Sequence, residues 1–130
     1  MLFFIQDILS HMEAIMYSDV DILYLRPIDE VWRSIGRFNS TQIASMSPGS
    51  EDGAPIPVYN PQFTRHPYYG KYGLNSGLMP MNMTRMRMLD LPSRLTKIYK
   101  EYESKMTMGD QDLFNIYFAF NPGECLAFYQ

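Results

Sequence analysis

The sequence has few of the residues that build disulfide frameworks or soft metal sites. It contains one cysteine, Cys125, and two histidines, His11 and His66, in 130 residues. A single cysteine excludes an internal disulfide and a thiolate metal cage. Two histidines that lie far apart in the sequence exclude a histidine-rich metal centre.

Net charge and apolar runs are equally limited. The formal net charge is only −3, with acidic and basic residues dispersed along the chain, so the basic patch of a nucleic-acid-binding protein is missing. No stretch approaches the roughly 20 apolar residues of a membrane span. The apolar opening, residues 1–6, is too short for the hydrophobic region of a signal peptide, and Asp7 interrupts it.

What the sequence does have is apolar and aromatic residues, at 46% and 15% of the chain. These fractions are typical of a packed globular protein. A chain of 130 residues is long enough for one domain with a core and too short for two. We therefore predict a single domain over residues 1–130.

Short apolar runs alternate with helical patterns, which predicts an α/β sheet. We expect strands at 14–17, 22–25, 42–46, 78–83 and 125–129, the fourth weakened by Pro80. We expect helices at 5–13, at 29–35 with Asp29 as N-cap, at 93–104 with Ser93 as N-cap, and from Gly109 onward.

The first motif that carries chemistry is Asp19-Val20-Asp21, at the exit of the first strand. Carboxylates at positions i and i+2 project to the same side of extended backbone and can converge on one cation. Oxygen ligands suit Mg²⁺ or Mn²⁺, which keep open positions for substrate phosphates. Taken alone, an Asp-x-Asp sequence is more often two solvated loop aspartates.

Two further motifs involve glycine. In Gly73–Gly77, glycines flank Asn75-Ser76, so backbone can approach a ligand closely and the Asn amide can donate and accept; an ordinary turn before a strand is the alternative. In Gly109–Asp112, two aspartates stand at a helix start. A helix N-terminus favours anions, so an aspartate there can simply cap the helix, and the alternative is that the motif contacts a ligand. Gln111 adds an uncharged amide that could face a sugar ring.

A Pro- and Gly-rich stretch, residues 47–70, lacks periodicity and is typical of a functional or mobile loop. Its end reads RHPYYGK, residues 65–71. Basic and tyrosine side chains suit the binding of a carbohydrate or peptide. The alternative is a loop that packs its aromatic side chains on its own domain.

Taken together and in this order, the motifs resemble the retaining glycosyltransferases of family 8, the glycogenin and galactosyltransferase group, and within it the glucoside xylosyltransferase subfamily. The resemblance covers nearly the whole chain. It is carried by DVDILYLRPIDEVW (19–32), FNSTQIA (38–44), RHPYYGK (65–71), NSGLMPMNMTR (75–85) and GDQDLFNI (109–116).

The resemblance implies a GT-A fold, the Rossmann-like fold of nucleotide-diphospho-sugar transferases. It implies transfer of xylose from UDP-xylose, in α-1,3 linkage and with retention, to O-linked glucose on EGF-like repeats of Notch-type glycoproteins. It also implies a parent protein in the ER or Golgi lumen, of type II membrane topology, whose signal anchor is absent from this chain. Asn39 and Asn82, in Asn-x-Ser/Thr triplets, mildly favour that compartment.

The resemblance also assigns roles to residues. Asp19 and Asp21 would hold Mn²⁺ (or Mg²⁺) on the donor diphosphate. Gln111 would lie near the anomeric carbon and act with Asp110 in catalysis. The remaining donor contacts would come from Asn75, Ser76, Gly77 and Asp112, and the acceptor-side loop would supply Arg65, His66, Tyr68 and Tyr69.

Two departures from the family pattern lead us to expect the central part of a catalytic domain, truncated at both ends. Family members place nucleotide-binding strands before the acidic pair, and they supply a third metal ligand, a histidine, near the carboxyl end. This chain ends at Gln130 before any such histidine. Two alternatives remain open: another family 8 transferase such as a xyloside xylosyltransferase, and a non-catalytic fragment that only binds ligands.

Overall fold

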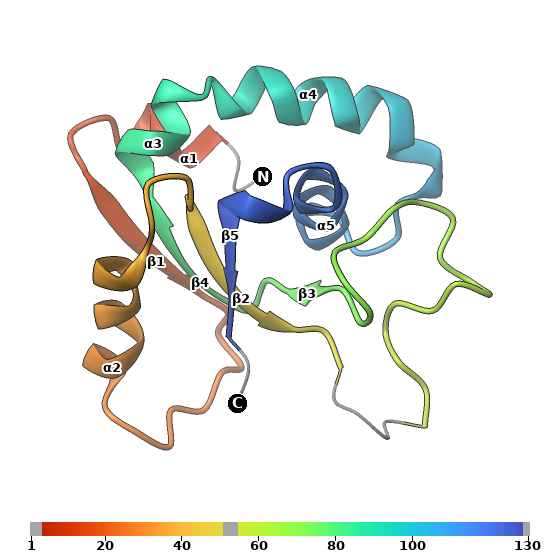
Figure 1. Cartoon of the computed structure of the whole chain (residues 1–130), viewed down its shortest axis with the longest axis horizontal. Helices are drawn as coiled ribbons and strands as arrows, with labels where there is room; N and C mark the ends of the chain where they lie inside the picture. Colours follow the sequence, from red (N-terminus) through yellow and green to blue (C-terminus); the bar gives the residue numbers. More distant parts are fainter. Residues whose placement is uncertain (1–3, 51–54, 129–130) are drawn as a thin grey trace.

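A mixed five-stranded sheet forms the centre of the computed structural model, which describes residues 4–50 and 55–128 (Figure 1). The order of the strands is β1-β4-β2-β3, and β5 pairs with β2 on its other side. The strands are β1 (Ala14–Ser18), β2 (Ala44–Pro48), β3 (Leu74–Asn75), β4 (Leu78–Asn82) and β5 (Cys125–Ala127). The predicted α/β class is therefore confirmed.

The sheet is mixed because only β5 runs parallel to its neighbour. β1 and β4 are antiparallel over their full length, from Ala14 opposite Asn82 to Ser18 opposite Leu78. β2 runs antiparallel to β4 and β3 and parallel to β5. This arrangement places the carboxyl end of β1, and so the acidic pair, beside the start of β4.

Helices fill the connections from β1 to β2 and from β4 to β5, and one short helix precedes β1. The α-helices are α1 (Ile5–Ile8), α2 (Ile28–Trp32), α3 (Met83–Met88), α4 (Leu91–Tyr102) and α5 (Asp110–Phe120), and the short 3-10 helices are η2 (Arg33–Arg37), η3 (Glu103–Lys105) and η4 (Pro122–Glu124). Figure 1 shows α4 along the outside, with α5 seen end-on beneath it. α5 packs against α4 and β3.

The core lies between α5 and the sheet. Residues 112–118 of α5 are all buried, so this helix is enclosed on every side, with α4 and β3 packed against it. Methionines of β2, β4 and α3 fill the space beneath it: Met46, Met79, Met81, Met83 and Met86 are at most 2% exposed. Flexible thioether chains fill irregular gaps of this kind.

Pro80 occupies a central strand without breaking the pairing of that strand with β1. The N–H group of Asn82 donates to the Ile43 carbonyl on the β2 side, and the nitrogen of Pro80, two residues earlier, points to the same side. There β2 pairs with β4 at one position, Ala44 opposite Met81, before it turns to β3. No residue of β2 is paired with Pro80, so the absence of an N–H group at Pro80 costs the sheet no hydrogen bond to β2.

Several expected boundaries are wrong. The first helix is limited to Ile5–Ile8, and residues 22–25 form no strand; Leu23 and Leu25 are 80% and 86% exposed. Apolar character alone does not make a strand when no neighbouring strand is available to pair with it.

Both predicted N-caps are also displaced. α2 begins at Ile28 after Pro27, which places Asp29 inside the first turn. α4 begins at Leu91, with Asp90 as N-cap in the left-handed region (φ 48°) and proline in the first turn, a position that proline favours because it has no N–H group to lose. Ser93 is therefore within the helix. Of the predicted final strand, Cys125–Ala127 is observed, and Tyr129 lies outside the described residues.

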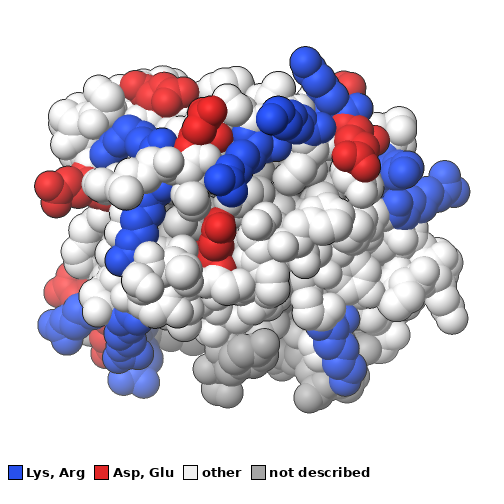
Figure 2. Space-filling model, turned by 45° about the horizontal axis from the view of Figure 1, so that its top comes forward, with Lys and Arg blue, Asp and Glu red and all other residues white. Residues whose placement is uncertain are grey.

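Charges of both signs lie on the α4 face, and lysine and arginine cover more of it than aspartate and glutamate (Figure 2). Figure 2 shows lysine and arginine side chains interspersed with aspartate and glutamate over this face, as the dispersed charges of the sequence predict. Within the described part of the chain, no helix is long and apolar enough to cross a membrane.

Candidate active site

The acidic pair follows directly on β1. The N–H group of Asp19 donates to the Gly77 carbonyl at 2.8 Å, which continues the β1–β4 pairing by one residue and fixes Asp19 against the start of β4. Asp19 is half-buried, whereas Val20 and Asp21 are exposed. The pair therefore lies at the edge of the sheet, open to solvent.

Gly77 allows three polar groups to meet at this edge. A Cβ atom at this position would lie 2.9 Å from Asn75 Oδ1 and 3.2 Å from Asp19 Oδ2, so a larger residue would push both oxygens away. The N–H group of Gly77 also donates to Asn75 Oδ1 at 2.8 Å. In the structure the backbone of the Gly73–Gly77 motif lies close to the chain's own Asp19 carboxylate; its approach to a ligand stays a prediction.

Tyr17 is a member of this cluster that the sequence analysis missed. Its hydroxyl donates to Asp19 Oδ1. The hydrogen bond to Asp19 raises the pKa of the tyrosine, burial adds to this, and the charges of Asp19, Asp110 and Asp21 act in the same direction. Three carboxylates therefore act on one hydroxyl, and the field at this edge of the sheet is negative, as a cation would require.

Gln111 reaches the same edge from α5. Its Oε1 accepts the N–H group of Ser76 at 3.0 Å and lies 3.4 Å from the Ser76 hydroxyl. Ser76 lies in a bulge: β2 pairs with Asn75 and again with Met81, and the residues between them lose their β2 partner. The backbone groups freed by the bulge are available to Gln111.

Asn115 holds the helix and the strand together beneath these groups. Its fully buried side chain accepts the N–H group of Leu74 at 2.7 Å and donates to the carbonyls of Leu74 (2.8 Å) and Gln111 (2.9 Å). A buried amide whose donors and acceptor are all used makes a specific contact. An Asn within the apolar run LFNIYF was the signal that could have identified it.

Asp112 points away from the acidic pair. It has no exposed surface; its Oδ2 accepts the N–H groups of Thr107 (2.6 Å) and Met108 (2.7 Å), and its Oδ1 accepts the Tyr59 hydroxyl at 2.7 Å. His66 Nε2 lies 3.4 Å from the same Oδ1. The GDQD motif is thus divided: Asp110 and Gln111 are half-buried toward the sheet edge, and Asp112 is bound inside the domain.

The RHPYYGK loop is also divided between the surface and the interior. Arg65 is exposed, and Tyr68 and Tyr69 are half-buried, but His66 is buried, with its Nδ1 2.8 Å from the Pro67 carbonyl. Because a carbonyl only accepts, Nδ1 carries the hydrogen. Of the four residues expected to face an acceptor, three retain surface.

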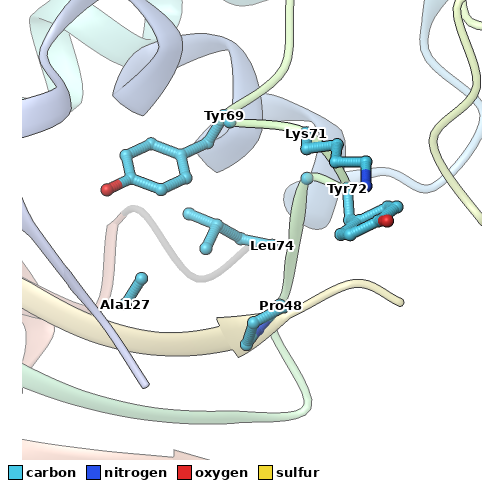
Figure 3. Close-up of a pocket in the computed structure, with 8 residues that line it drawn as sticks. Pro48, Tyr69, Lys71, Tyr72, Leu74 and Ala127 are labelled. Atoms are coloured by element: carbon cyan, nitrogen blue, oxygen red, sulfur yellow. The ribbon is translucent and has the colours of Figure 1, made fainter. Parts of the chain in front are cut away.

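Two hollows border this loop. One, of about 400 Å³, lies over Asp112 and His66 and is lined also by Phe63, Arg65 and Lys105. The other, of about 230 Å³, lies between the loop and the sheet (Figure 3); Tyr69, Lys71 and Tyr72 stand on one side of it, and Pro48, Leu74 and Ala127 on the other. Neither hollow includes the acidic pair, which lies on open surface.

The predicted donor set for a metal ion consists of the two carboxylates of Asp19 and Asp21. Among residues 4–50 and 55–128, no group of three or more His, Cys, Asp or Glu side chains is arranged to hold a metal ion. Asp19 and Asp21 supply the hard oxygen ligands that Mn²⁺ and Mg²⁺ prefer, so the residues fit such an ion as a partial donor set.

Comparisons with known proteins show which proteins the chain resembles. The chain is 45% identical over 136 residues to glucoside xylosyltransferase 1 of Homo sapiens and 44% identical to that of Mus musculus, in each case over 96% of this chain. It spans about a third of the length of these relatives, 30% and 33%.

Solved structures show the fold. The apo form of mouse xyloside xylosyltransferase 1 matches with a TM-score of 0.73 at 23% identity, over 97% of this chain and 48% of that one. An active-site mutant of LgtC matches with a TM-score of 0.67 at 14% identity, over 96% and 41%. The architecture is therefore part of a GT-A fold.

The model of the glycosyl transferase family 8 matches residues 2–124. This span contains the acidic pair, the Asn75–Gly77 bulge and the GDQD helix start. The chain therefore belongs to glycosyl transferase family 8.

Proposed function

We propose that this chain forms part of a retaining glycosyltransferase that transfers xylose from UDP-xylose to O-linked glucose on EGF-like repeats. One observation carries the proposal: Asp19, the Asn75–Gly77 bulge and Gln111 meet at one sheet edge although they come from distant parts of the chain. Membership of family 8 and the identity to glucoside xylosyltransferases support the choice of sugar.

Asp19 and Asp21 would hold the divalent cation, Mn²⁺ or Mg²⁺, on the donor diphosphate. Such a cation supplies charge neutralisation when a nucleoside diphosphate departs. Asp19 is prepared for this role because the Gly77 carbonyl and the Tyr17 hydroxyl fix its backbone and one carboxylate oxygen. Asp21, exposed on the open side, is free to complete the pair from solvent.

Gln111 and Asp110 would act at the donor sugar, together with Asn75, Ser76 and Gly77. An amide is a poor nucleophile, so we favour front-side displacement, in which the Gln111 oxygen stabilises positive charge at the anomeric carbon. Asp110 is half-buried, and its charge contributes to raising the pKa of Tyr17; its carboxylate is suited to hydrogen-bond sugar hydroxyls. Asp112 has no exposed surface, and we assign it a supporting role behind the donor contacts.

The acceptor would approach over the RHPYYGK loop. Arg65 is exposed, and Tyr68 and Tyr69 keep part of their rings at the surface; tyrosine rings that are apolar on the face and polar at the tip suit sugars and peptide alike. We place the reaction in the ER or Golgi lumen, with a glycoprotein as acceptor and the parent protein anchored in the membrane.

Two other functions have support from specific observations. A xyloside acceptor in place of a glucoside is favoured by the structural match to xyloside xylosyltransferase 1. A binding role without turnover is the second alternative, because among the described residues no third His, Cys, Asp or Glu side chain is arranged with the acidic pair to hold a metal ion.

Calorimetry of the chain with UDP, with and without Mn²⁺, tests the donor site directly. We expect UDP binding that depends on Mn²⁺ and is lost in Asp21→Asn. Asp29→Asn is the matched control, because Asp29 is an exposed carboxylate in the first turn of α2. Equal heats for both variants would remove the metal site from the proposal.

A transfer assay then separates the alternatives. UDP-xylose, UDP-glucose and UDP-galactose are offered with a glucosylated EGF-like repeat and with a xyloside as acceptors. The enzyme is mouse glucoside xylosyltransferase 1 in which this chain replaces the homologous segment. We expect transfer of xylose to the glucoside; metal-dependent UDP binding by the chain, combined with an inactive chimera, would favour the binding role.

A further inference from the structure

The position of Asp21 relative to Asp19 depends on the peptide that follows Asp19. Asp19 is held against β4, because its N–H group donates to the Gly77 carbonyl at 2.8 Å. Asp21 lies two residues further on and is exposed. The Asp19 carbonyl and the N–H group of Val20 lie in one rigid plane. A hydrogen bond to that carbonyl therefore sets the direction in which the chain runs on to Asp21.

Ser18 donates such a hydrogen bond, and Tyr24 supports it. The Ser18 hydroxyl donates to the Asp19 carbonyl oxygen at 3.1 Å. The same hydroxyl oxygen accepts the hydroxyl of Tyr24 at 2.8 Å. A hydroxyl group can donate one hydrogen bond while it accepts another. Tyr24, Ser18 and the Asp19 carbonyl therefore form a chain of two hydrogen bonds, in which each bond strengthens the other.

Tyr24 also closes the loop that carries Asp21, residues 19–24, which we call the acidic loop. Ile22 turns back toward β4: its Cδ1 lies 3.4 Å from the place of a Cβ atom on Gly77. Tyr24, two residues later, turns back toward the end of β1 through Ser18. The acidic loop is thus held at both ends and in the middle, and Asp21 lies between the held points.

The exposure of the neighbouring residues shows that Tyr24 is turned inward. Tyr24 is 37% exposed, whereas Leu23 and Leu25 on either side of it are 80% and 86% exposed. Side chains alternate in this way where extended backbone lies against a surface on one side only. The contact between Tyr24 and Ser18 therefore follows from the course of the backbone.

We infer that Tyr24 is a positioning residue of the acidic pair, whose hydroxyl, acting through Ser18, holds the acidic loop so that Asp21 stays beside Asp19. The inference rests on the proposed function where it concerns the cation; the part that concerns the loop applies to the chain alone. Groups that hold metal ligands in place contribute to metal affinity although they do not touch the metal.

The test uses Tyr24→Phe and, as matched control, Tyr99→Phe. The Tyr99 hydroxyl also donates one hydrogen bond at the surface, to Glu103 Oε1 at 2.7 Å in α4. Each variant keeps the ring and loses one such bond, so the two losses of stability should be small and similar. The variants differ in whether the lost bond supports the acidic loop.

NMR relaxation of the chain without metal or nucleotide measures the mobility of the acidic loop. We expect backbone order parameters typical of rigid backbone, about 0.85, at Val20 and Asp21 in the unaltered chain and in Tyr99→Phe. In Tyr24→Phe they should fall toward about 0.6. Unchanged order parameters in Tyr24→Phe, or low values already in the unaltered chain, would overturn the inference.

Calorimetry with UDP at a fixed Mn²⁺ concentration measures the consequence for the cation site. The affinity for UDP should fall roughly tenfold in Tyr24→Phe, stay unchanged in Tyr99→Phe, and recover when excess Mn²⁺ is added. Equal affinities in the two variants would overturn the part of the inference that concerns the cation. If the unaltered chain binds no UDP with Mn²⁺, the proposed donor site fails, and the order parameters still decide whether Tyr24 holds the loop.

Ser18→Ala provides a second test, because it interrupts the chain of hydrogen bonds in its middle. The Ser18→Ala chain should show the same loss of order at Val20 and Asp21 as Tyr24→Phe. The double variant should lose no more than either single variant, since both act through one path. Fully additive losses would show that the two hydroxyl groups act separately and would overturn the role of Tyr24 through Ser18.

Discussion

Gly73→Ala is expected to destabilise the chain far more than Gly70→Ala, although both glycines adopt left-handed backbone. Their φ angles are 67° and 58°. An alanine in this region costs about 1 kcal/mol of backbone strain at either position. Any difference between the two variants therefore measures what the new methyl group meets.

The surroundings of the two glycines differ completely. A Cβ at Gly70 would have no heavy atom within 4 Å, whereas a Cβ at Gly73 would lie 2.1, 2.6 and 2.8 Å from three carbon atoms of the Tyr59 ring. The ring cannot simply turn away, because its hydroxyl is bonded to buried Asp112. Overpacking of this kind costs about 1–3 kcal/mol, so the total for Gly73→Ala is about 2–4 kcal/mol.

Urea denaturation of both variants gives the comparison. For a domain of this size, each kcal/mol lowers the melting temperature by roughly 4 °C, so thermal unfolding should separate the two variants clearly. Equal losses for Gly70→Ala and Gly73→Ala would refute the packing of Tyr59 against Gly73, and with it the placement of the whole loop.

A double-mutant cycle assigns the clash to one partner. Tyr59→Ala removes the ring, so Gly73→Ala introduced into that background should cost only its backbone strain, about 1 kcal/mol. The coupling energy is then about 1–3 kcal/mol, in the range expected for residues in contact. Additive effects would mean that the methyl group clashes with something other than Tyr59.

Two predictions concern covalent chemistry. Burial raises the pKa of the Cys125 thiol from 9.0 to about 12, so alkylation at neutral pH should label the unfolded chain and spare the folded one. Its contribution to stability is fully present below pH 9 and is lost as the pH rises toward 12; a flat unfolding free energy across that window would contradict it. In a secretory host we expect a glycan on Asn39, which is exposed, and none on Asn82, whose side chain caps α3 before fully buried Met83. Deglycosylation followed by mass measurement checks both sites.

The parts of the fold that depend on local pattern could be predicted from the sequence. The apolar run at 14–17 forms β1, and the Gly109 turn followed by helical spacing forms α5 from Asp110. The prediction of a strand at 22–25 was wrong because no strand of the described chain is available there to pair with this segment. Pairing partners are a property of the whole sheet, which no local window contains.

Single residues of the candidate site could be singled out from the sequence, but their proximity in space could not. Asp19 and Gly77 were each singled out from their own short motif, and the pairing of β1 with β4 brings them together. Tyr17 and Tyr59 were missed because a tyrosine in an apolar run or a loop is indistinguishable from a packing residue. Only the acceptor at the tip of each ring, Asp19 or Asp112, reveals its role.

The division of the GDQD motif follows from helix geometry. Successive residues of an α-helix are turned by about 100°, so three polar residues in a row cannot all face one ligand. Gln111 takes the side of Ser76, and Asp112, one step on, takes the side of Tyr59 and the loop. A short motif at a helix start is thus able to serve a ligand with one residue and its own loop with the next. Substitution of Asp112 should therefore mainly lower the stability of the loop. Substitution of Gln111 or Asp110 should mainly weaken the interaction with the donor sugar that we propose.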